Sequence, residues 1–510
     1  MMYPLAYAGS LLCLALWFLH RTNNTKRTFF QTGFFTALGV FILSVFLLDA
    51  SFEQRLGVLF RDLSVLSLFG IFFQILSYKK TWQFTGGLIA IGAFGFYYWL
   101  GMLPVTQPDE YYSPSLNAEG ELLVELAEGA GPEKLDGIAN LYDLAINQAF
   151  QPQSADITEL DDYYIVDVPQ SHMGDLEQII RELQNIKEVD WVEPNETMLI
   201  DPIKAKRSGT DLQKKYGIND PGLEYLWGFD AMKMDKLYSY LTARQIQPQK
   251  KALLAILDTG VDAKHEDIKD NYRSIDPSYD DDPKGHGTHC AGIAAAVTNN
   301  NVGIASMASG QQYYEVTSIK VLNAGGMGTQ QTIISGMILA ADSGADVISL
   351  SLGGLSNQVK ERAYQKAVEY AQAKGAIVVA AAGNANQNAK RYVPAGVKGV
   401  LTVSAVDQSL SKASFSNAVS EVEMAVAAPG VQIYSTFPGD AYQTFNGTSM
   451  ATPYVAGLAA LLKSMDPSLE TKDIYEILNV TGVSTKNSKE TGRLIQPYAA
   501  VRQLVERNPL

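Results

Sequence analysis

The sequence predicts an α/β catalytic domain built on a doubly wound, mainly parallel sheet. Short continuous apolar runs, as expected for buried parallel strands, alternate with longer segments that have helical apolar spacing. The predicted strands are 252–257, 314–322, 346–351, 376–382 and 400–405. The predicted helices are 286–298, 329–343, 357–374, 448–463 and 471–479. Strands that alternate with helices are typical of parallel sheets with helices on both faces.

Residues able to act as acid, base and nucleophile lie at the ends of these elements. Asp258 follows the first strand, at the carboxyl edge where open α/β sheets build their sites. His286 begins one predicted helix, and Ser449 lies at the start of another, within the sequence N-G-T-S-M-A-T-P. A serine hydroxyl becomes a good nucleophile when a base takes its proton, and a carboxylate orients that base. The sequence therefore predicts an Asp–His–Ser site.

A donor for the developing negative charge follows another predicted strand. The run 376–382 leads into Gly383 and Asn384, whose side-chain amide can donate a hydrogen bond to an oxyanion. The backbone N–H of Ser449 is the second predicted donor, because partial positive charge at a helix N-terminus favours an anion.

Five motifs in one order carry a family resemblance: D-T-G-V-D, G-H-G-T-H-C-A-G, S-L-G-G, A-A-G-N and G-T-S-M-A-T-P. Over residues 220–500 the chain resembles the subtilisin-like serine protease (subtilase) family. The cysteine-containing H-G-T-H-C-A-G is similar to the proteinase K and thermitase branches. The resemblance implies a serine endopeptidase that works through an acyl-enzyme. Its implied catalytic residues are Asp258, His286 and Ser449 as the triad and Asn384 as the oxyanion donor.

The resemblance also implies where a polypeptide substrate would lie. One matching segment lines the cleft for the residue before the scissile bond, and the other is an exposed edge that pairs with an extended substrate. The matching residues are Ser351, Leu352 and Gly353 in the first segment and Gly326, Met327 and Gly328 in the second. Glycine-rich edges let another backbone approach closely, although a plain loop is the alternative. We expect a broad or apolar substrate preference.

A structural calcium ion is implied in the same way, because hard oxygen ligands suit calcium. The implied ligands are the side chains of Asp267 and Asn300 and the carbonyls of Val302 and Ile304. Asp280, Asp281 and Asp282 could bind a second ion, but an acidic run is more often a solvated loop.

Two further residues of the histidine motif have structural explanations. His289, three residues beyond His286, is expected to be a packed histidine rather than a second base. Cys290 is expected to pack as a small apolar group beneath its helix, with oxidation or mercurial sensitivity as an open alternative. The rival function is a pseudoprotease that binds without catalysis, but such proteins usually lack a triad member and this chain keeps all three.

The first hundred residues predict a membrane region. Apolar segments occur at about 5–19, 29–48, 56–77 and 84–103, and a spanning helix needs about 20 apolar residues. Positive loops stay cytoplasmic, and the basic residues lie in the first and third loops. We therefore expect a multipass membrane protein with lipid as a partner and the protease domain on the extracytoplasmic side. Release of the protease after self-cleavage is an open alternative. A simple anchor is favoured over a channel or sensor.

An α+β module is predicted between the membrane region and the protease. Strand-like alternation at 121–126 and 163–168, helical spacing at 174–183 and a strand at 188–195 resemble the ferredoxin-like inhibitory prodomain of subtilases. This module would act as an intramolecular inhibitor of a self-processing zymogen. The predicted domains are 1–104 (transmembrane anchor of about four helices), 105–118 (linker), 119–202 (prodomain), 203–219 (processing junction) and 220–510 (protease).

Charge excludes one class of partner. Residues 1–104 contain seven basic and three acidic residues, whereas the whole chain contains 40 basic and 54 acidic residues. The remainder is therefore strongly acidic, which argues against nucleic-acid binding because that function needs a basic patch. With only two cysteines, a disulfide framework is not expected.

Overall fold

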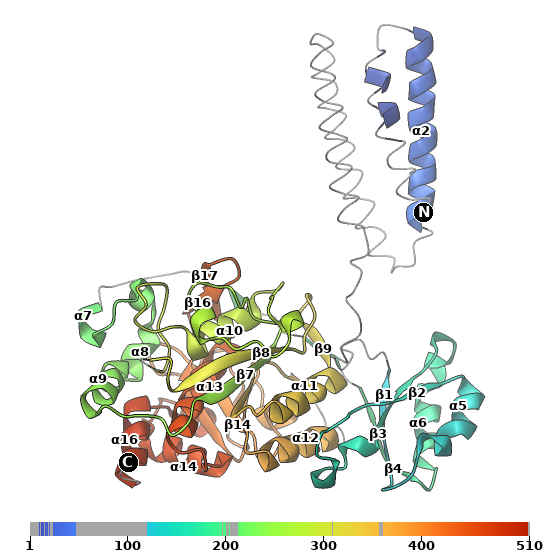
Figure 1. Cartoon of the computed structure of the whole chain (residues 1–510). Coiled ribbons are helices and arrows are strands. Elements are labelled where there is room, and N and C mark those ends of the chain that lie inside the picture. Colours follow the sequence, from blue (N-terminus) through green and yellow to red (C-terminus); the bar gives the residue numbers. More distant parts are fainter. Residues whose placement is uncertain are drawn as a thin grey trace. The chain divides into compact units, whose positions relative to one another are not determined.

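The computed structural model describes two compact units, residues 1–111 and 112–510, each of which is considered by itself (Figure 1). The described residues are 10, 12–14, 16–18, 20, 24–46, 120–195, 197–199, 203–204, 213–308, 310–355 and 361–507. In the first unit the main described element is α2 (Asn24–Phe46). The predicted linker at 105–118 lies outside the described residues.

The prediction of a multipass membrane protein with lipid as a partner is wrong. Among the residues that the structure describes, no helix combines the length and apolar character needed to cross a bilayer. The predicted segments at 56–77 and 84–103 lie outside the described residues, and the one at 5–19 lies only partly within them.

A seven-stranded sheet organises the second unit, in the order β18-β15-β14-β12-β10-β7-β8. Every neighbouring pair in this sheet is parallel. Its strands are β7 (Ala252–Asp258), β8 (Tyr314–Lys320), β10 (Val347–Leu350), β12 (Ile377–Ala381), β14 (Leu401–Val406), β15 (Ala425–Pro429) and β18 (Arg493–Leu494). The five strands predicted from apolar runs are confirmed, whereas β15 and β18 were not predicted.

Helices cover both faces of this sheet (Figure 1). Alternate residues of one strand enter different cores: Leu254 and Ile256 of β7 join the core that includes α10 and α13, while Leu253, Ala255 and Leu257 join the core that includes α11 and α12. The helices are α8 (Trp227–Ala231), α9 (Met234–Arg244), α10 (His286–Ala295), α11 (Gln330–Asp342), α12 (Arg362–Ala373), α13 (Thr448–Met465), α14 (Thr471–Thr481), α15 (Ser488–Thr491) and α16 (Pro497–Arg507). The α/β fold class is confirmed.

A smaller antiparallel sheet precedes the large one, in the order β2-β3-β1-β4. Its strands and helices alternate as β1 (Leu122–Leu126), α5 (Asp136–Tyr142), β2 (Ala145–Gln148), β3 (Tyr163–Asp167), α6 (Leu176–Gln184) and β4 (Val189–Pro194). The apolar face of α6, with Ile179 and Leu183 fully buried, packs in a core with strand residues such as Val124 and Val166.

Short strands complete the second unit. They are β5 (Thr197–Leu199), β6 (Ile203–Lys204), β9 (Met327–Thr329), β11 (Gly354–Leu355), β13 (Tyr392–Val393), β16 (Ile433–Phe437) and β17 (Ala441–Asn446), and α7 (Gln213–Tyr216) follows β6. β16 and β17 form a hairpin, β5 pairs with β9, and β6 pairs with β17, all antiparallel.

Candidate active site

Asp258 is the last residue of β7 and is fully buried. Its Oδ1 accepts a hydrogen bond from the backbone N–H of Thr259 at 2.8 Å. This position is at the carboxyl edge of the parallel sheet, as the sequence predicts.

His286 is the first residue of α10 and meets this carboxylate. Its Nδ1 lies 2.8 Å from Asp258 Oδ1 and 2.9 Å from Oδ2. An ionised carboxylate can only accept, so Nδ1 carries the proton and Nε2 keeps a free lone pair in the neutral ring. Nε2 is buried and has no hydrogen-bond partner among the described residues. The ring is therefore oriented as a base that can still take a proton.

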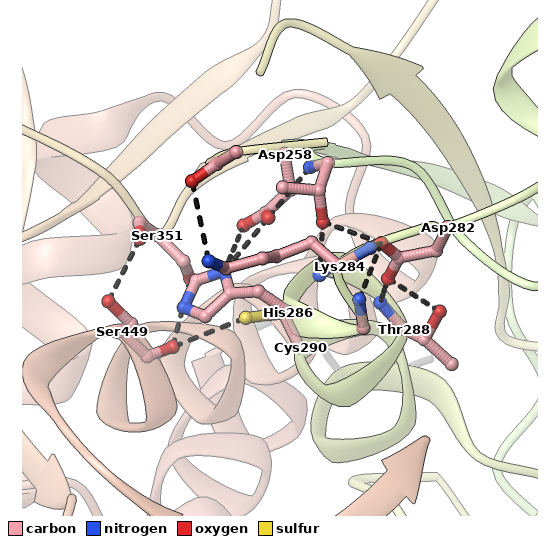
Figure 2. Close-up of polar contacts among 12 residues, drawn as sticks. Asp258, Asp282, Lys284, His286, Thr288, Cys290, Ser351 and Ser449 are labelled. Atoms are coloured by element: carbon pink, nitrogen blue, oxygen red, sulfur yellow. Dashed lines mark hydrogen bonds and ion pairs between the residues drawn. The ribbon is translucent and has the colours of Figure 1, made fainter. Parts of the chain in front are cut away.

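Ser449 is the second residue of α13, and 8% of it is exposed. Figure 2 shows the His286 ring between the Asp258 carboxylate and Ser449. The Ser449 hydroxyl donates to the carbonyl of Ser351 at 2.9 Å, and the Ser351 hydroxyl donates back to the Ser449 carbonyl at 2.9 Å. In this conformer the serine does not donate to Nε2, so a side-chain rotation must precede attack; such contacts often tighten only once substrate binds.

Asn384 follows β12, and its amide is oriented by Thr448. Oδ1 accepts from the Thr448 N–H and from the Thr448 hydroxyl, each at 2.9 Å, so Nδ2 is left to donate elsewhere. A Cβ placed on Gly447 would lie 3.5 Å from both Asn384 Nδ2 and Ser449 N. The two predicted donors therefore border the same space beside the serine.

One of the two predicted substrate segments contacts this site, and the other pairs with a strand of the same chain. Ser351 directly follows β10 and contacts Ser449, as described above. Met327 and Gly328 belong to β9, where Met198 of β5 is paired with Gly328. The Met198 side chain is buried, and a Cβ on Gly354 would lie 3.1 Å from its Cγ. An extended strand of the chain itself thus occupies the edge that the sequence assigns to substrate.

The predicted calcium ligands also come together. Asp267 is fully buried; its Oδ1 accepts from Asn300 Nδ2 at 2.9 Å and its Oδ2 from the Ile304 N–H at 2.8 Å. Burial raises the pKa of Asp267 to about 8. Val302 lies in the same loop, with its N–H donating to Asn300 Oδ1 at 2.9 Å.

A second buried carboxylate at this loop was not found from the sequence. Asp220 accepts from the N–H groups of Asn299 and Asn300 at 2.7 and 3.0 Å, and burial raises its pKa to about 6. Neither Asp220 nor Asp267 has a basic partner among the described residues. Two buried carboxylates with an amide side chain nearby fit a hard divalent cation, which would offset their charge. The signal for it in the sequence was the position of Asp220, which is the first residue of the predicted protease domain.

The other residues of the histidine motif are buried. His289 stacks on Phe445 with ring centroids 4.5 Å apart, and burial lowers its pKa to about 3. Burial raises the pKa of the Cys290 thiol, which makes the thiol a poor nucleophile. The ligand atoms of Asp258, His286 and Cys290 lie within 4.8 Å of one another, so a soft metal ion could bind there and block His286.

The site has the arrangement of a serine hydrolase on an α/β sheet. A carboxylate lies within hydrogen-bond distance of a histidine, a serine lies at a helix N-terminus, and two N–H donors border the space beside it. The family model of the subtilases (Subtilase family) matches residues 249–494. The chain is 45% identical to thermitase from Thermoactinomyces vulgaris over 247 residues, which is 45% of this chain and 85% of that protein. It is 41% identical to subtilisin DY from Bacillus licheniformis over 287 residues, or 54% of this chain and 98% of that protein.

A third relative is the thermophilic serine proteinase of Bacillus sp. (strain AK1), 40% identical over 297 residues that make up 57% of this chain and 67% of the relative. The chain belongs to the subtilase family, and it is a serine endopeptidase.

Proposed function

We propose that the protein hydrolyses peptide bonds through an acyl-enzyme formed on Ser449. His286 takes the serine proton at Nε2 and later returns it to the leaving amine, while Asp258 holds the ring and stabilises its charged form. Asn384 Nδ2 and the Ser449 N–H bind the oxyanion. The observation that carries the proposal is the Asp258–His286 contact at 2.8 Å, together with a buried Nε2 that has no hydrogen-bond partner in the described part of the chain.

Fluorophosphonate labelling tests this assignment. We expect the wild-type chain to be labelled and Ser449→Ala to lose labelling and peptidase activity. Ser468→Ala, in an exposed turn after α13, is the matched control and should keep both. Failure to label a folded, processed wild-type chain would favour the pseudoprotease alternative.

We also propose that the chain is made as a zymogen, in which residues 119–202 form an inhibitory prodomain and 203–219 the processing junction. The β-α-β-β-α-β order of the small sheet supports this proposal. Its contacts with the protease domain support it further. Arg362 Nε lies 2.9 Å from Glu125 Oε2, Gln330 Nε2 donates to Glu193 Oε1 at 2.9 Å, and the Gln331 N–H donates to Asn195 Oδ1 at 3.0 Å.

The N-terminus of the purified protein tests self-processing. Mass spectrometry should find a wild-type protease that begins within residues 203–219, and an intact chain for Ser449→Ala. The same N-terminus in both variants would contradict self-processing, because cleavage would then come from another protease.

Calcium is proposed as a structural ion held by Asp267, Asn300, Val302 and Ile304, with Asp220 as an additional carboxylate. Bound calcium would supply positive charge between two buried carboxylates and would thereby hold the segment before α8 against the loop at 298–304.

A further inference from the structure

Asp282 lies in the turn before α10, and its buried carboxylate accepts five hydrogen bonds. On Oδ1 the donors are the Thr259 hydroxyl at 2.7 Å and the N–H groups of Lys284 and Gly285 at 3.1 and 2.8 Å. On Oδ2 the donors are the N–H and hydroxyl of Thr288 at 2.8 and 2.7 Å. Figure 2 shows these contacts beside the Asp258–His286 pair.

These five bonds join the two chain segments that carry Asp258 and His286. Thr259 directly follows Asp258, while Gly285 and Thr288 lie on either side of His286 along the chain. The Thr259 hydroxyl also accepts from the Gly287 N–H at 3.1 Å, which closes a ring of hydrogen bonds between the two segments. One carboxylate thus connects the end of β7 to the first turn of α10.

The two segments approach so closely that a small shift of either one would change the geometry of the Asp258–His286 contact. A Cβ on Gly287 would lie 2.0 Å from the carbonyl oxygen of Gly260 and 3.0 Å from Asp258 Cβ. The helix start therefore rests directly on the chain around Asp258, and what fixes this contact also fixes the Asp258–His286 distance.

The neighbouring aspartates have different partners. Asp280 accepts from the hydroxyls of Tyr272 and Ser274, each at 2.7 Å. Asp281 forms an ion pair with Lys320, and its side chain is 72% exposed. Only Asp282 of the three is directed at the segments that carry the catalytic pair, so its neighbours are natural controls.

We infer that Asp282 is a positioning residue for the reaction, whose carboxylate holds the end of β7 and the start of α10 in the register at which Asp258 and His286 meet. The inference rests on the proposed roles of these two residues. Asp282 itself touches neither substrate nor the reacting atoms. A simple cap of α10 would satisfy the same helix N–H groups, but it would not need the bond to Thr259.

The test compares Asp282→Asn with Asp281→Asn in the full chain, with active sites counted by fluorophosphonate titration. The amide keeps the size of the side chain but replaces one acceptor by a donor that faces N–H and hydroxyl groups. We expect kcat to fall about 10- to 100-fold in Asp282→Asn, as for small misplacements of catalytic groups. KM should stay within about twofold, and Asp281→Asn should match the wild type.

Two readouts separate positioning from stability. The low-field proton resonance of the His286–Asp258 hydrogen bond should shift or broaden in Asp282→Asn at temperatures well below its unfolding midpoint. Thr259→Val, which is close in shape and leaves the bonds from α10 to Asp282 intact, should reduce kcat in the same direction even if Asp282→Asn fails to fold.

A purely structural role would lower the unfolding temperature and leave kcat and the proton resonance unchanged in the folded variants, which would overturn the inference. Absence of labelling in the wild type would instead contradict the proposed function, so the two failures are distinguishable.

Discussion

Asn384 divides its amide between two tasks, because Thr448 holds Oδ1 while Nδ2 borders the space beside Ser449 N. Removing a donor of this kind destabilises the transition state but leaves the binding of the ground-state substrate nearly unchanged. We expect Asn384→Ala to lower kcat by about 100- to 1000-fold with little change in KM. Steady-state hydrolysis of a peptide substrate measures both constants, and a change confined to KM would contradict the role.

The loss should be specific to that amide. Asn388→Ala is a suitable control, since Asn388 lies in the same loop and its side chain accepts from the Lys390 N–H at 2.9 Å. This variant should retain nearly full kcat.

At this scale, local motifs predict where Asp258, His286 and Asn384 lie, because Asp258 ends a strand, Asn384 lies shortly after a strand and His286 begins a helix. They do not predict Asp282 or Asp220. An aspartate in an acidic run or a polar loop looks solvent-exposed in the sequence, and its burial arises from partners 23 and 79 residues away, Thr259 and Asn299.

At the scale of elements, β5 and β6 lie close together in the sequence and each pairs with a strand of the protease domain. β5 pairs with β9, and β6 pairs with Phe445 and Asn446 of β17, just before Ser449. Only the sequence Ile200-Asp201-Pro202, which lies outside the described residues, joins the two strands. Proline lacks an N–H and restricts the residue before it, so bonds beside Pro202 are expected to resist self-cleavage.

We therefore expect Pro202→Ala to create a new self-cleavage product with its N-terminus between residues 200 and 203, whereas the wild type is cut at or beyond residue 203. Mass spectrometry of the two purified proteins identifies the ends. The double variant Pro202→Ala, Ser449→Ala should show no new end. Identical termini in Pro202→Ala and the wild type would show that the proline does not protect the segment.

The long, apolar elements were predictable, whereas the polar strand β17 and the short apolar strand β15 were not. The predicted helix 448–463 corresponds to α13 (Thr448–Met465) and the predicted strand 400–405 to β14 (Leu401–Val406). β17, with the sequence A-Y-Q-T-F-N, shows neither a continuous apolar run nor strict alternation, and β15 ends in a proline. Their strand conformation depends on pairing with distant partners, which the local pattern does not contain.

The surface between the small sheet and the protease domain contains a buried acid with an unusual pKa. Burial raises the pKa of Glu193 to about 8 from about 4.5. Glu125, which is paired with Arg362, lies near it, and Gln330 and Trp191 donate to its carboxylate. The folded state therefore binds more protons than the unfolded state between about pH 4.5 and 8. The contribution of Glu193 protonation to the free energy of unfolding is accordingly lost as pH rises through that range.

We expect Glu193→Gln to raise the unfolding temperature of the intact Ser449→Ala chain at pH 8.5 and to change it little at pH 5. Each kcal/mol gained corresponds to about 2–4 °C in a domain of 150–250 residues and to a smaller shift in a longer one. Calorimetry at both pH values measures the effect. Glu177→Gln, on the exposed face of α6, is the control. An equal shift at both pH values would show that ionisation of Glu193 is not the cause.

At the scale of the whole molecule, the loop at 298–304 and the segment around Asp220 are joined through buried carboxylates. Calcium should therefore raise the unfolding temperature, and a chelator should lower it. A ligand at about 100 times its Kd stabilises by about 2.7 kcal/mol. Asp267→Asn should abolish the difference between calcium and chelator, whereas Asp270→Asn, at an exposed position, should preserve it. An unchanged calcium response in Asp267→Asn would exclude this site.

The pairing of β5 with β9 and of β6 with β17 has a consequence for how activity could appear. In the proposed zymogen the inhibitory segment belongs to the same chain and is present at a fixed local concentration, so dilution cannot remove it. Before any cut, the rate of activation should be independent of protein concentration. After a cut, the same contacts become an ordinary binding equilibrium, and the active fraction should rise as the protein is diluted.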